Sequence, residues 1–384
     1  MPRESSGSAV GRCEEQIERL HRDMAAAQLA PTWKYVKDFV AVAPRVTYRP
    51  YLWKWDDVIS HLMRAGTLIS PERGAERRSM EHVNPDLAPS FAASHTIATA
   101  FQLVRPGEVA AAHRHAAAAI RFPVRNPGGP VYTTVQGQRL PMEQFDLILT
   151  PAGTWHEHAN ETKHDVIWLD VLDYPLVNLL QASFFQPYPR DRQPVTEPVP
   201  ADGRTGRVRP AGWDANSMDM PVLRYTWRDM RARLEAWRDQ PGSPFDGVML
   251  EYVHPLTAGP TLPTLACRVQ LLRPGEHTRA HRACSSTVYF VIEGTGASII
   301  AGERFEWGQG DVFVVPTWAW HEHASSGGTD ALLFSVTDEP VMRVLGLFRE
   351  EPFDAGDGQQ RVTSVFAPEA RPLVHDGGPA PRGL

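Results

Sequence analysis

The sequence contains little cysteine, no long apolar run and no excess of positive charge. Its 384 residues include three cysteines, Cys13, Cys267 and Cys284, and this odd, unpatterned set argues against a disulfide framework. Because the first residues also lack an apolar signal core, we expect a reducing, cytoplasmic location. No apolar run approaches the roughly eighteen residues of a membrane helix. A net charge of −6 argues against nucleic acid as a partner, so neither membrane nor nucleic acid is expected.

Proline and glycine, in contrast, are plentiful. The 34 prolines and 29 glycines favour many short strands joined by turns. The length leaves room for two domains with connections. Hydrophobic and charged contents of 42% and 22% are those of an ordinary globular protein.

A few segments have helical patterns. Apolar residues recur at helical spacing between residues 13 and 28. Asp56 or Asp57 is expected to cap a second helix that Gly66 ends. Thr226 is expected to cap another helix that runs to Trp237.

Residues 30–55 are rich in aromatic side chains, from Trp33 to Trp55. We expect an arm that packs on the rest of the protein or on a neighbouring subunit. A ligand-stacking role is the alternative.

Two histidine-containing segments together form a metal-binding pattern. Side chains alternate along a strand, so His113 and His115 of an H-x-H pair point to the same face. A later antiparallel strand, entered through a turn at Pro151, would add His156. The spacings G-x5-H-x-H and P-x-G-x2-H-x3-N match the signature of a cupin domain and predict these three histidines as metal ligands. A surface or core role for the H-x-H pair is the alternative.

Residues 116–122 contain no carboxylate, although many cupins place a glutamate ligand there. Three neutral imidazoles leave a divalent metal with its full charge and open positions, which suits a chelating anionic substrate together with dioxygen. Arg121 is an even number of residues away from His113 and His115. On an unbroken strand its side chain would therefore point into the same cavity. A guanidinium beside a metal is costly unless an anion pairs with it. A salt bridge at the barrel mouth is the alternative.

The chain contains an internal repeat. The segment Arg105–Glu108 recurs as Arg273–Glu276, and Trp155–Ala159 recurs as Trp320–Ala324. Such self-similarity indicates two domains of one kind.

The second copy has lost part of the metal pattern. His281 and His321 remain, but Ala283 stands where the first copy has His115, beside Cys284. We expect this copy to be structural, without strong metal binding.

The predicted fold is all-β: a bicupin of two double-stranded β-helix (jelly-roll) barrels with an N-terminal helical arm. The expected domains are an arm (1–90), a first barrel with the metal site (91–185), a linker with a helix (186–245), a second barrel (246–340) and a tail (341–384).

Specific motifs in both barrels resemble the family of gentisate, salicylate and 1-hydroxy-2-naphthoate 1,2-dioxygenases. The resemblance covers roughly residues 30–350. Among the segments that carry it are Glu76-Arg-Arg78, Val83-Asn-Pro85, His113-Arg-His115, Arg121-Phe122, Thr154-Trp-His-Glu-His158, Ile167-Trp-Leu-Asp170 and Phe313-Val-Val-Pro316.

This resemblance implies an Fe(II)-dependent enzyme, usually a homotetramer, that uses O2 to cleave an aromatic hydroxy acid between its carboxyl-bearing and hydroxyl-bearing carbons. It also implies roles for individual residues. They are iron ligands (His113, His115, His156), arginines that hold the substrate carboxylate (Arg73, Arg77, Arg121), a histidine near substrate and oxygen (His158) and a buried supporting acid (Asp170).

Two positions depart from the family pattern. Ala98 stands where relatives commonly have tryptophan, and Ala100 stands where some have glycine. Both are expected to shape the substrate pocket. The expected substrate is gentisate, with salicylate, 5-halo- or 5-nitrosalicylate and 1-hydroxy-2-naphthoate as alternatives. A non-catalytic bicupin that binds a small molecule, and an isomerase or oxidase of another cupin branch, are the rival functions.

Overall fold

The computed structural model describes residues 7–69, 78–190, 192–196, 223–255 and 257–368. The chain divides into a short unit up to Arg45 and a larger unit from Val46 onward. The short unit contains α1 (Gly7–Ala26) and α2 (Thr32–Phe39). The helix predicted over residues 13–28 is therefore present and begins earlier. Within the described ranges, no helix is long and apolar enough to cross a membrane.

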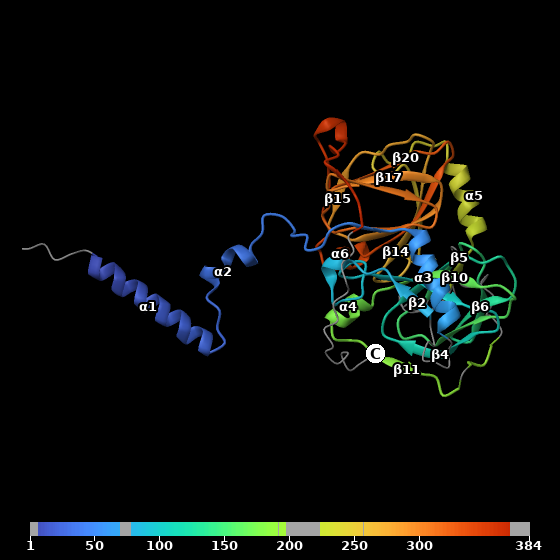
Figure 1. Cartoon of the computed structure of the whole chain (residues 1–384), viewed down its shortest axis with the longest axis horizontal. Helices are drawn as coiled ribbons and strands as arrows, with labels where there is room; N and C mark the ends of the chain where they lie inside the picture. The colour runs from blue at the N-terminus through green and yellow to red at the C-terminus, as the bar shows by residue number, and fades with distance from the viewer. Residues whose placement is uncertain (1–6, 70–77, 191, 197–222, 256, 369–384) are drawn as a thin grey trace, which may run out of the picture. The chain divides into compact units, whose positions relative to one another are not determined.

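The first barrel of the larger unit consists of two sheets, with strand orders β12-β8-β5-β10-β3-β2 and β11-β4-β9-β6-β7 (Figure 1). The rings of His158 and Trp168, one from each sheet, lie 5.5 Å apart, so the sheets face a common interior. The strands are β2 (Arg78–Glu81), β3 (Ala98–Val104), β4 (Val109–His115), β5 (Ala119–Arg125), β6 (Val131–Val135), β7 (Gln138–Pro141), β8 (Leu147–Thr150), β9 (His156–Asn160), β10 (Val166–Leu172), β11 (Phe185–Pro187) and β12 (Arg224–Tyr225).

The second barrel repeats this plan, with sheet orders β1-β19-β16-β21-β14-β13 and β22-β15-β20-β17-β18-β23. Tyr289 and His323 meet across its interior at 4.9 Å. The strands are β1 (Tyr51–Trp53), β13 (Val248–Tyr252), β14 (Ala266–Leu272), β15 (His281–Ala283), β16 (Thr287–Glu293), β17 (Thr295–Ile300), β18 (Glu303–Gly308), β19 (Val312–Val315), β20 (His321–Ser325), β21 (Ala331–Thr337), β22 (Glu350–Pro352) and β23 (Ser364–Val365). The all-β class is confirmed, whereas the division at residues 90, 185, 245 and 340 stays a prediction.

The α-helices that accompany the barrels in the described residues are α3 (Trp55–Leu68), α4 (Tyr174–Leu179), α5 (Trp227–Trp237) and α6 (Glu339–Val344). Thr226 caps α5 as predicted, because its hydroxyl accepts a hydrogen bond from the Asp229 amide at 3.2 Å. The cap predicted for α3 is wrong, since Asp56 and Asp57 lie inside its first turn. Gly66 lies within α3 and does not end it. An added Cβ there would stand 2.6 Å from Leu103 Cδ2, so close packing explains the glycine.

Each barrel receives an edge strand from the segment that precedes the other barrel. Strand β1, which precedes the first barrel in the chain, pairs with β19 of the second. Strand β12, which precedes the second barrel, pairs with β8 of the first. The aromatic segment around Trp53 is therefore part of the second barrel's sheet, a non-local pairing that local sequence cannot show.

A buried aspartate of the receiving barrel binds the first residue of the helix that follows each exchanged strand. Asp311 Oδ1 accepts a hydrogen bond from the Trp55 amide at 2.8 Å, and Asp311 also binds the Lys54 ammonium. In the first barrel, Asp146 Oδ1 accepts from the Trp227 amide at the same distance. The exchange is thus built twice with the same contacts.

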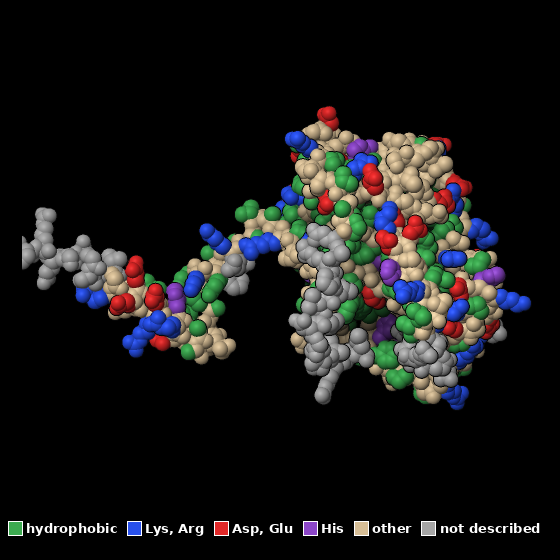
Figure 2. Space-filling model, viewed as in Figure 1, with side chains coloured by type: hydrophobic (Ala, Val, Ile, Leu, Met, Phe, Trp, Pro, Cys, Tyr) green, Lys and Arg blue, Asp and Glu red, His purple; other side chains and the backbone are tan. Residues whose placement is uncertain are grey.

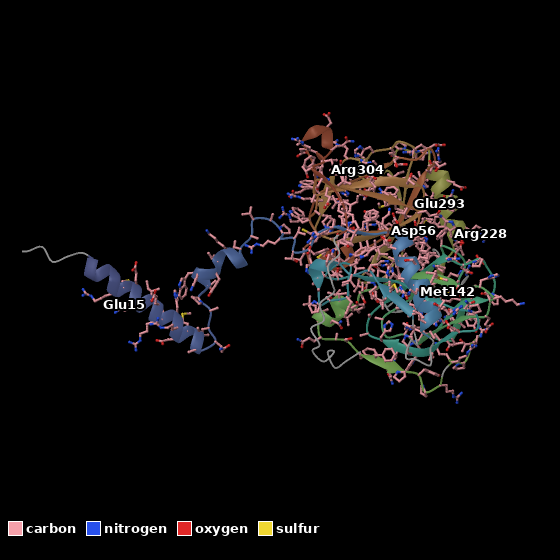
Figure 3. All side chains as sticks on the ribbon, viewed as in Figure 1. Glu15, Asp56, Met142, Arg228, Glu293 and Arg304 are labelled. Carbon is pink, nitrogen blue, oxygen red and sulfur yellow. The ribbon has the colours of Figure 1, made fainter. Side chains whose placement is uncertain are left out.

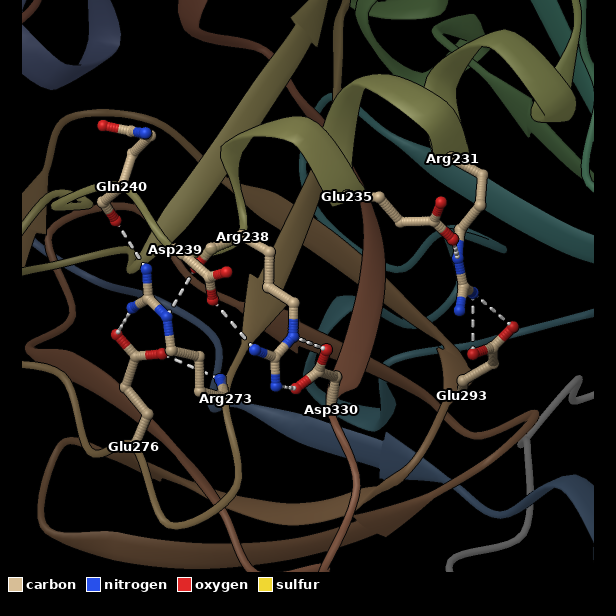
Figure 4. A network of polar contacts seen from close by, with 9 residues as sticks. All are labelled: Arg231, Glu235, Arg238, Asp239, Gln240, Arg273, Glu276, Glu293 and Asp330. Carbon is tan, nitrogen blue, oxygen red and sulfur yellow. Dashed lines mark hydrogen bonds and ion pairs between the residues drawn. The ribbon is translucent and has the colours of Figure 1, made fainter.

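Charged side chains fasten α5 to the second barrel (Figure 4). Arg238 Nε lies 2.6 Å from Asp330 Oδ2, and Arg231 Nη1 lies 2.8 Å from Glu293 Oε1. Because these pairs are partly exposed, each adds little stability by itself. They fix the direction of the helix, whose apolar residues Met230 and Leu234 are buried.

We predict that Asp311→Ala lowers the free energy of unfolding by on the order of 2 kcal/mol, because the partly buried amides of Trp55 and Gly308 lose their acceptor. Thermal unfolding measures the loss. The control is Asp56→Ala on the exposed side of α3 (labelled in Figure 3), where a loss of at most about 1 kcal/mol in the free energy of unfolding is expected. Equal effects of the two substitutions would contradict this assignment.

Candidate active site

Three histidines meet at one end of the first barrel. Strand β4 supplies His113 and His115, and β9 pairs with it antiparallel so that His156 stands opposite His113. The nitrogen ligand atoms of the three rings all lie within 4.8 Å of one another. The strand arrangement that the H-x-H spacing predicted is thus present.

Backbone carbonyls fix the orientation of all three rings. Each ring bonds through Nδ1 to a carbonyl oxygen two residues away, at 2.7 Å for His113, 2.8 Å for His115 and 2.9 Å for His156. A carbonyl only accepts, so Nδ1 carries the proton and the lone pair of each neutral ring is on Nε2. A hydrogen bond at the second ring nitrogen is typical of metal-binding histidines.

The environment of His156 keeps its ring neutral. The side chain is fully buried, and burial, reinforced by the charge of Arg121, lowers its pKa well below the ordinary value. Its Nε2 has no hydrogen-bond partner among the described residues. An orphaned buried nitrogen beside two more imidazoles is a donor set that fits a divalent transition metal.

Arg121 lies on a different strand from the one the sequence suggested. Strand β4 ends at His115 and β5 begins at Ala119, so the parity argument along one strand is wrong. Arg121 nevertheless faces the interior from the opposite sheet. Its Nη1 donates to the Thr150 hydroxyl at 2.6 Å, and its Nε lies 3.4 Å from Asp170 Oδ1. Both charged side chains are almost wholly buried, so Arg121 is a cation held at a fixed place beside the histidines.

His158 stands on the same strand as His156, two residues later. Its Nδ1 lies 2.7 Å from the Thr133 hydroxyl, which itself donates to the Met142 sulfur. Since that hydroxyl proton is used, we assign the Nδ1 proton to His158, so that Nε2 is the basic nitrogen of the neutral ring. Thr133 was not anticipated from the sequence, because its role depends on the pairing of β6 with β9.

The wall opposite the histidines contains small side chains. Ala98 and Ala100 are buried on β3 and share the interior face with Asp170, which is paired directly with Ala100. Figure 2 shows the molecule hollowed at the level of this barrel, with histidine side chains inside the hollow. Arg73 and Arg77, predicted to hold the substrate, lie outside the described residues.

At the equivalent site of the second barrel, carboxylates lie beside the remaining histidine. His281 Nδ1 lies 3.1 Å from Glu350 Oε1, and its Nε2 lies 3.8 Å from Asp246 Oδ1. The hydrogen bond from His281 lowers the pKa of Glu350. Ala283 is on β15 where β4 has a ligand histidine. Among the described residues, the three histidines of the first barrel form a cluster that could hold a metal ion, and the second barrel has none.

A separate polar hollow of about 570 Å³ opens at the other end of β4 and β9. None of the predicted site residues contributes to it. Its lining consists of Arg105, Pro106, Arg125, Asn126, Pro127, Gln144, Lys163, His164 and Asp165.

Comparisons with known proteins agree with this geometry. The cupin domain family matches residues 100–172 and 268–337, one segment in each barrel, which confirms the bicupin fold. A 5-aminosalicylate 1,2-dioxygenase of Comamonas sp. is 61% identical over 358 residues, covering 92% of this chain and 95% of that protein. A 1-hydroxy-2-naphthoate 1,2-dioxygenase of Nocardioides sp. is 40% identical over 315 residues, covering 80% of each.

Solved structures agree as well. The salicylate 1,2-dioxygenase of Pseudoaminobacter salicylatoxidans, solved as an adduct with gentisate, superimposes with a TM-score of 0.78 at 29% identity and covers 91% of this chain and 95% of that one. These relatives are ring-cleaving enzymes, which leaves the non-catalytic alternative without support. With two cupin barrels, a histidine triad in the first and a 61% identical dioxygenase spanning nearly its whole length, the chain belongs to the ring-cleaving 1,2-dioxygenases of the gentisate and salicylate type.

Proposed function

We propose that this enzyme is Fe(II)-dependent and cleaves the ring of a 2-hydroxybenzoate with an amino group at position 5, between the carboxyl-bearing and hydroxyl-bearing carbons. The 61% identity to a 5-aminosalicylate 1,2-dioxygenase is the observation that carries the choice of substrate. Gentisate is the second candidate, because the structurally similar salicylate 1,2-dioxygenase was solved as an adduct with it.

His113, His115 and His156 would hold the iron through their Nε2 atoms. The ion would supply Lewis acidity toward the substrate's oxygen atoms and one-electron chemistry toward O2. The triad contributes no negative charge, so a chelating dianion is the ligand that balances this site. A 2-hydroxybenzoate provides that charge through its carboxylate and its deprotonated hydroxyl.

Arg121 would bind and orient the substrate carboxylate. Its guanidinium already binds Thr150 and Asp170, which limits its movement, and a planar guanidinium matches a carboxylate in shape and charge. Asp170 acts through Arg121 by holding it in place. Arg73 and Arg77 are proposed to add positive charge to the same pocket.

His158 would act as a proton acceptor and then as a hydrogen-bond donor. Its Nε2 is the basic nitrogen while Nδ1 is bonded to Thr133, so this ring can take the proton that the substrate hydroxyl loses on binding. The protonated ring can then donate a hydrogen bond to developing negative charge on oxygen.

Ala98 and Ala100 would set the size of the pocket, and a wall of small side chains leaves room for ring substituents. Salicylate, 5-halo- and 5-nitrosalicylate and 1-hydroxy-2-naphthoate are therefore further candidates. A homotetramer and a cytoplasmic location complete the proposal and rest on the family resemblance and the composition.

We predict that His156→Ala abolishes both metal binding and oxygen consumption, because it removes one of three ligands. His321→Ala, the equivalent change in the second barrel, should leave the metal content at about one ion per chain. Metal analysis of the purified proteins measures this. Two tightly bound ions per wild-type chain would contradict the assignment.

We predict that Arg121→Ala weakens substrate binding by on the order of 2–5 kcal/mol, because it removes one partner of a largely buried charge pair. Metal content should stay near that of the wild type. Anaerobic titration with salicylate, beside metal analysis, separates the two effects. Unchanged affinity would make Arg121 a structural residue.

We predict that wild-type enzyme consumes one O2 per 5-aminosalicylate, with a higher kcat/KM than for gentisate, salicylate or 1-hydroxy-2-naphthoate. Ala98→Trp should penalise the bulkiest substrates most, because an indole would occupy space at the pocket wall. Oxygen uptake across this panel measures both effects. If the order of preference and all ratios survive in Ala98→Trp, residue 98 does not face the substrate.

A further inference from the structure

An arginine in the second barrel stands where the first barrel has an alanine. Arg268 on β14 is paired directly with Glu251 on the edge strand β13. Its Nε donates to Glu251 Oε2 at 2.7 Å, and its Nη2 donates to Glu339 Oε2 at 2.7 Å. Two carboxylates thus enclose one guanidinium at the edge of the sheet.

The repeat identifies the equivalent positions in the first barrel. Ala100 on β3 corresponds to Arg268, because each is five residues before the Arg-Pro-Gly-Glu segment of its own barrel. Glu81 on β2 is paired with Ala100 in the same register, so it corresponds to Glu251. Tyr174, the first residue of α4, corresponds to Glu339, the first residue of α6. The first barrel therefore keeps the edge-strand acid and lacks the cation.

Glu81 faces the active-site interior. One transverse row of the sheet runs from Arg121 through Asp170 and Ala100 to Glu81, and cross-strand neighbours point to the same face. Ala100 is small, so the space above it lies between Glu81 and the Arg121–Asp170 pair. A ligand oriented by Arg121 would extend along this row.

Among the described residues, no cation is paired with the carboxyl of Glu81. It makes no hydrogen bond or ion pair with any residue that the structure describes. Although the side chain is accessible to solvent, the surrounding protein and, to a lesser degree, the charge of Asp170 raise its pKa to about 8. The Tyr174 hydroxyl donates to the Phe91 carbonyl, so it is directed to the backbone. A ligand that donates hydrogen bonds would give Glu81 the partner that Glu251 finds in Arg268.

We infer that Glu81 is a specificity-determining residue that accepts a hydrogen bond from an amino or hydroxyl substituent on the ring of the bound 2-hydroxybenzoate, in the space that the Arg268 side chain fills in the second barrel. The inference rests on the proposed function and deepens it. A carboxyl oxygen accepts from an amino group, whereas methyl, halogen and nitro substituents have no proton to donate. Glu81 therefore selects for donors and against the other substituents.

A matched pair of ligands tests this selectivity. 5-Aminosalicylate and 5-methylsalicylate have similar size but differ in the ability to donate. We expect the metal-loaded wild-type enzyme to bind the amino compound more tightly than the methyl compound under anaerobic conditions. Glu81→Leu should reduce that ratio about three- to tenfold, mainly through the amino compound, because the amino group loses its acceptor oxygen. Glu81→Gln, which keeps an acceptor oxygen, should fall between the two.

The control is Glu251→Leu, the same change at the equivalent position of the second barrel. It should lower thermal stability, because Arg268 loses one of its two acceptors, and leave the ligand ratio unchanged. A ratio that is the same in wild type, Glu81→Leu and Glu81→Gln overturns the inference. If that happens while the wild type still consumes oxygen with 5-aminosalicylate, the proposed function stands and the role of Glu81 alone is wrong. If the wild type consumes no oxygen with any 2-hydroxybenzoate, the proposed function is wrong, and the ratio of affinities still decides the role of Glu81.

A second measurement tests the geometry without any ligand. Ala100→Arg should rebuild the ion pair of the second barrel, so its effect on the melting temperature should be more favourable when Glu81 is present than in Glu81→Gln. A double-mutant cycle isolates this coupling. Ala100→Arg should also exclude 5-aminosalicylate, since the guanidinium would occupy the ligand's space. Absence of coupling between positions 81 and 100 would overturn the inference, because the two side chains would then not share this space.

Discussion

The rings of Phe122 and Phe334 stack across the boundary between the two barrels, with centroids 4.1 Å apart and planes within 7° of each other. They belong to one continuous cluster of buried apolar side chains to which both barrels contribute. One sheet of each barrel therefore has its outer face committed to this shared core. Only the inner face of that sheet remains for polar groups, and this division puts Phe122 on the outer face and Arg121 on the inner face of the same strand. A slip of one residue in register would exchange them.

Polar contacts between the barrels reinforce the shared core in a reciprocal way. Asp173, which precedes α4, accepts from the Thr264 hydroxyl of the second barrel at 2.5 Å, and Asp338, which precedes α6, accepts from the Thr96 hydroxyl of the first at the same distance. The exchange of β1 and β12 has the same reciprocal character. Because each barrel is completed by parts of the other, we expect the two to unfold together.

The sequence indicated the parts of the site that depend on local spacing. The H-x-H pattern placed His113 and His115 on one face, and the turn after Pro151 brought His156 to the adjacent strand. What it could not indicate depends on pairing between distant segments. The strand for Arg121 was misjudged because nothing local marks the turn between β4 and β5. Glu81 was overlooked because its importance comes from its position opposite Ala100. A comparison of the two repeats could have found it, since Met80-Glu81 corresponds to Leu250-Glu251.

The two barrels show how one scaffold can serve stability in one copy and binding in the other. In the second copy, Arg268 joins two carboxylates and His281 lies between Asp246 and Glu350, so these side chains interact with groups of the protein itself. The first copy replaces the arginine by Ala100 and keeps a third histidine, which leaves Glu81 and the orphaned Nε2 of His156 facing the interior. A buried nitrogen without a partner, such as His156 Nε2, costs folding free energy, and that cost is recovered when a metal binds it. The second barrel, joined to the first through the common core, contributes to the stability that offsets this cost.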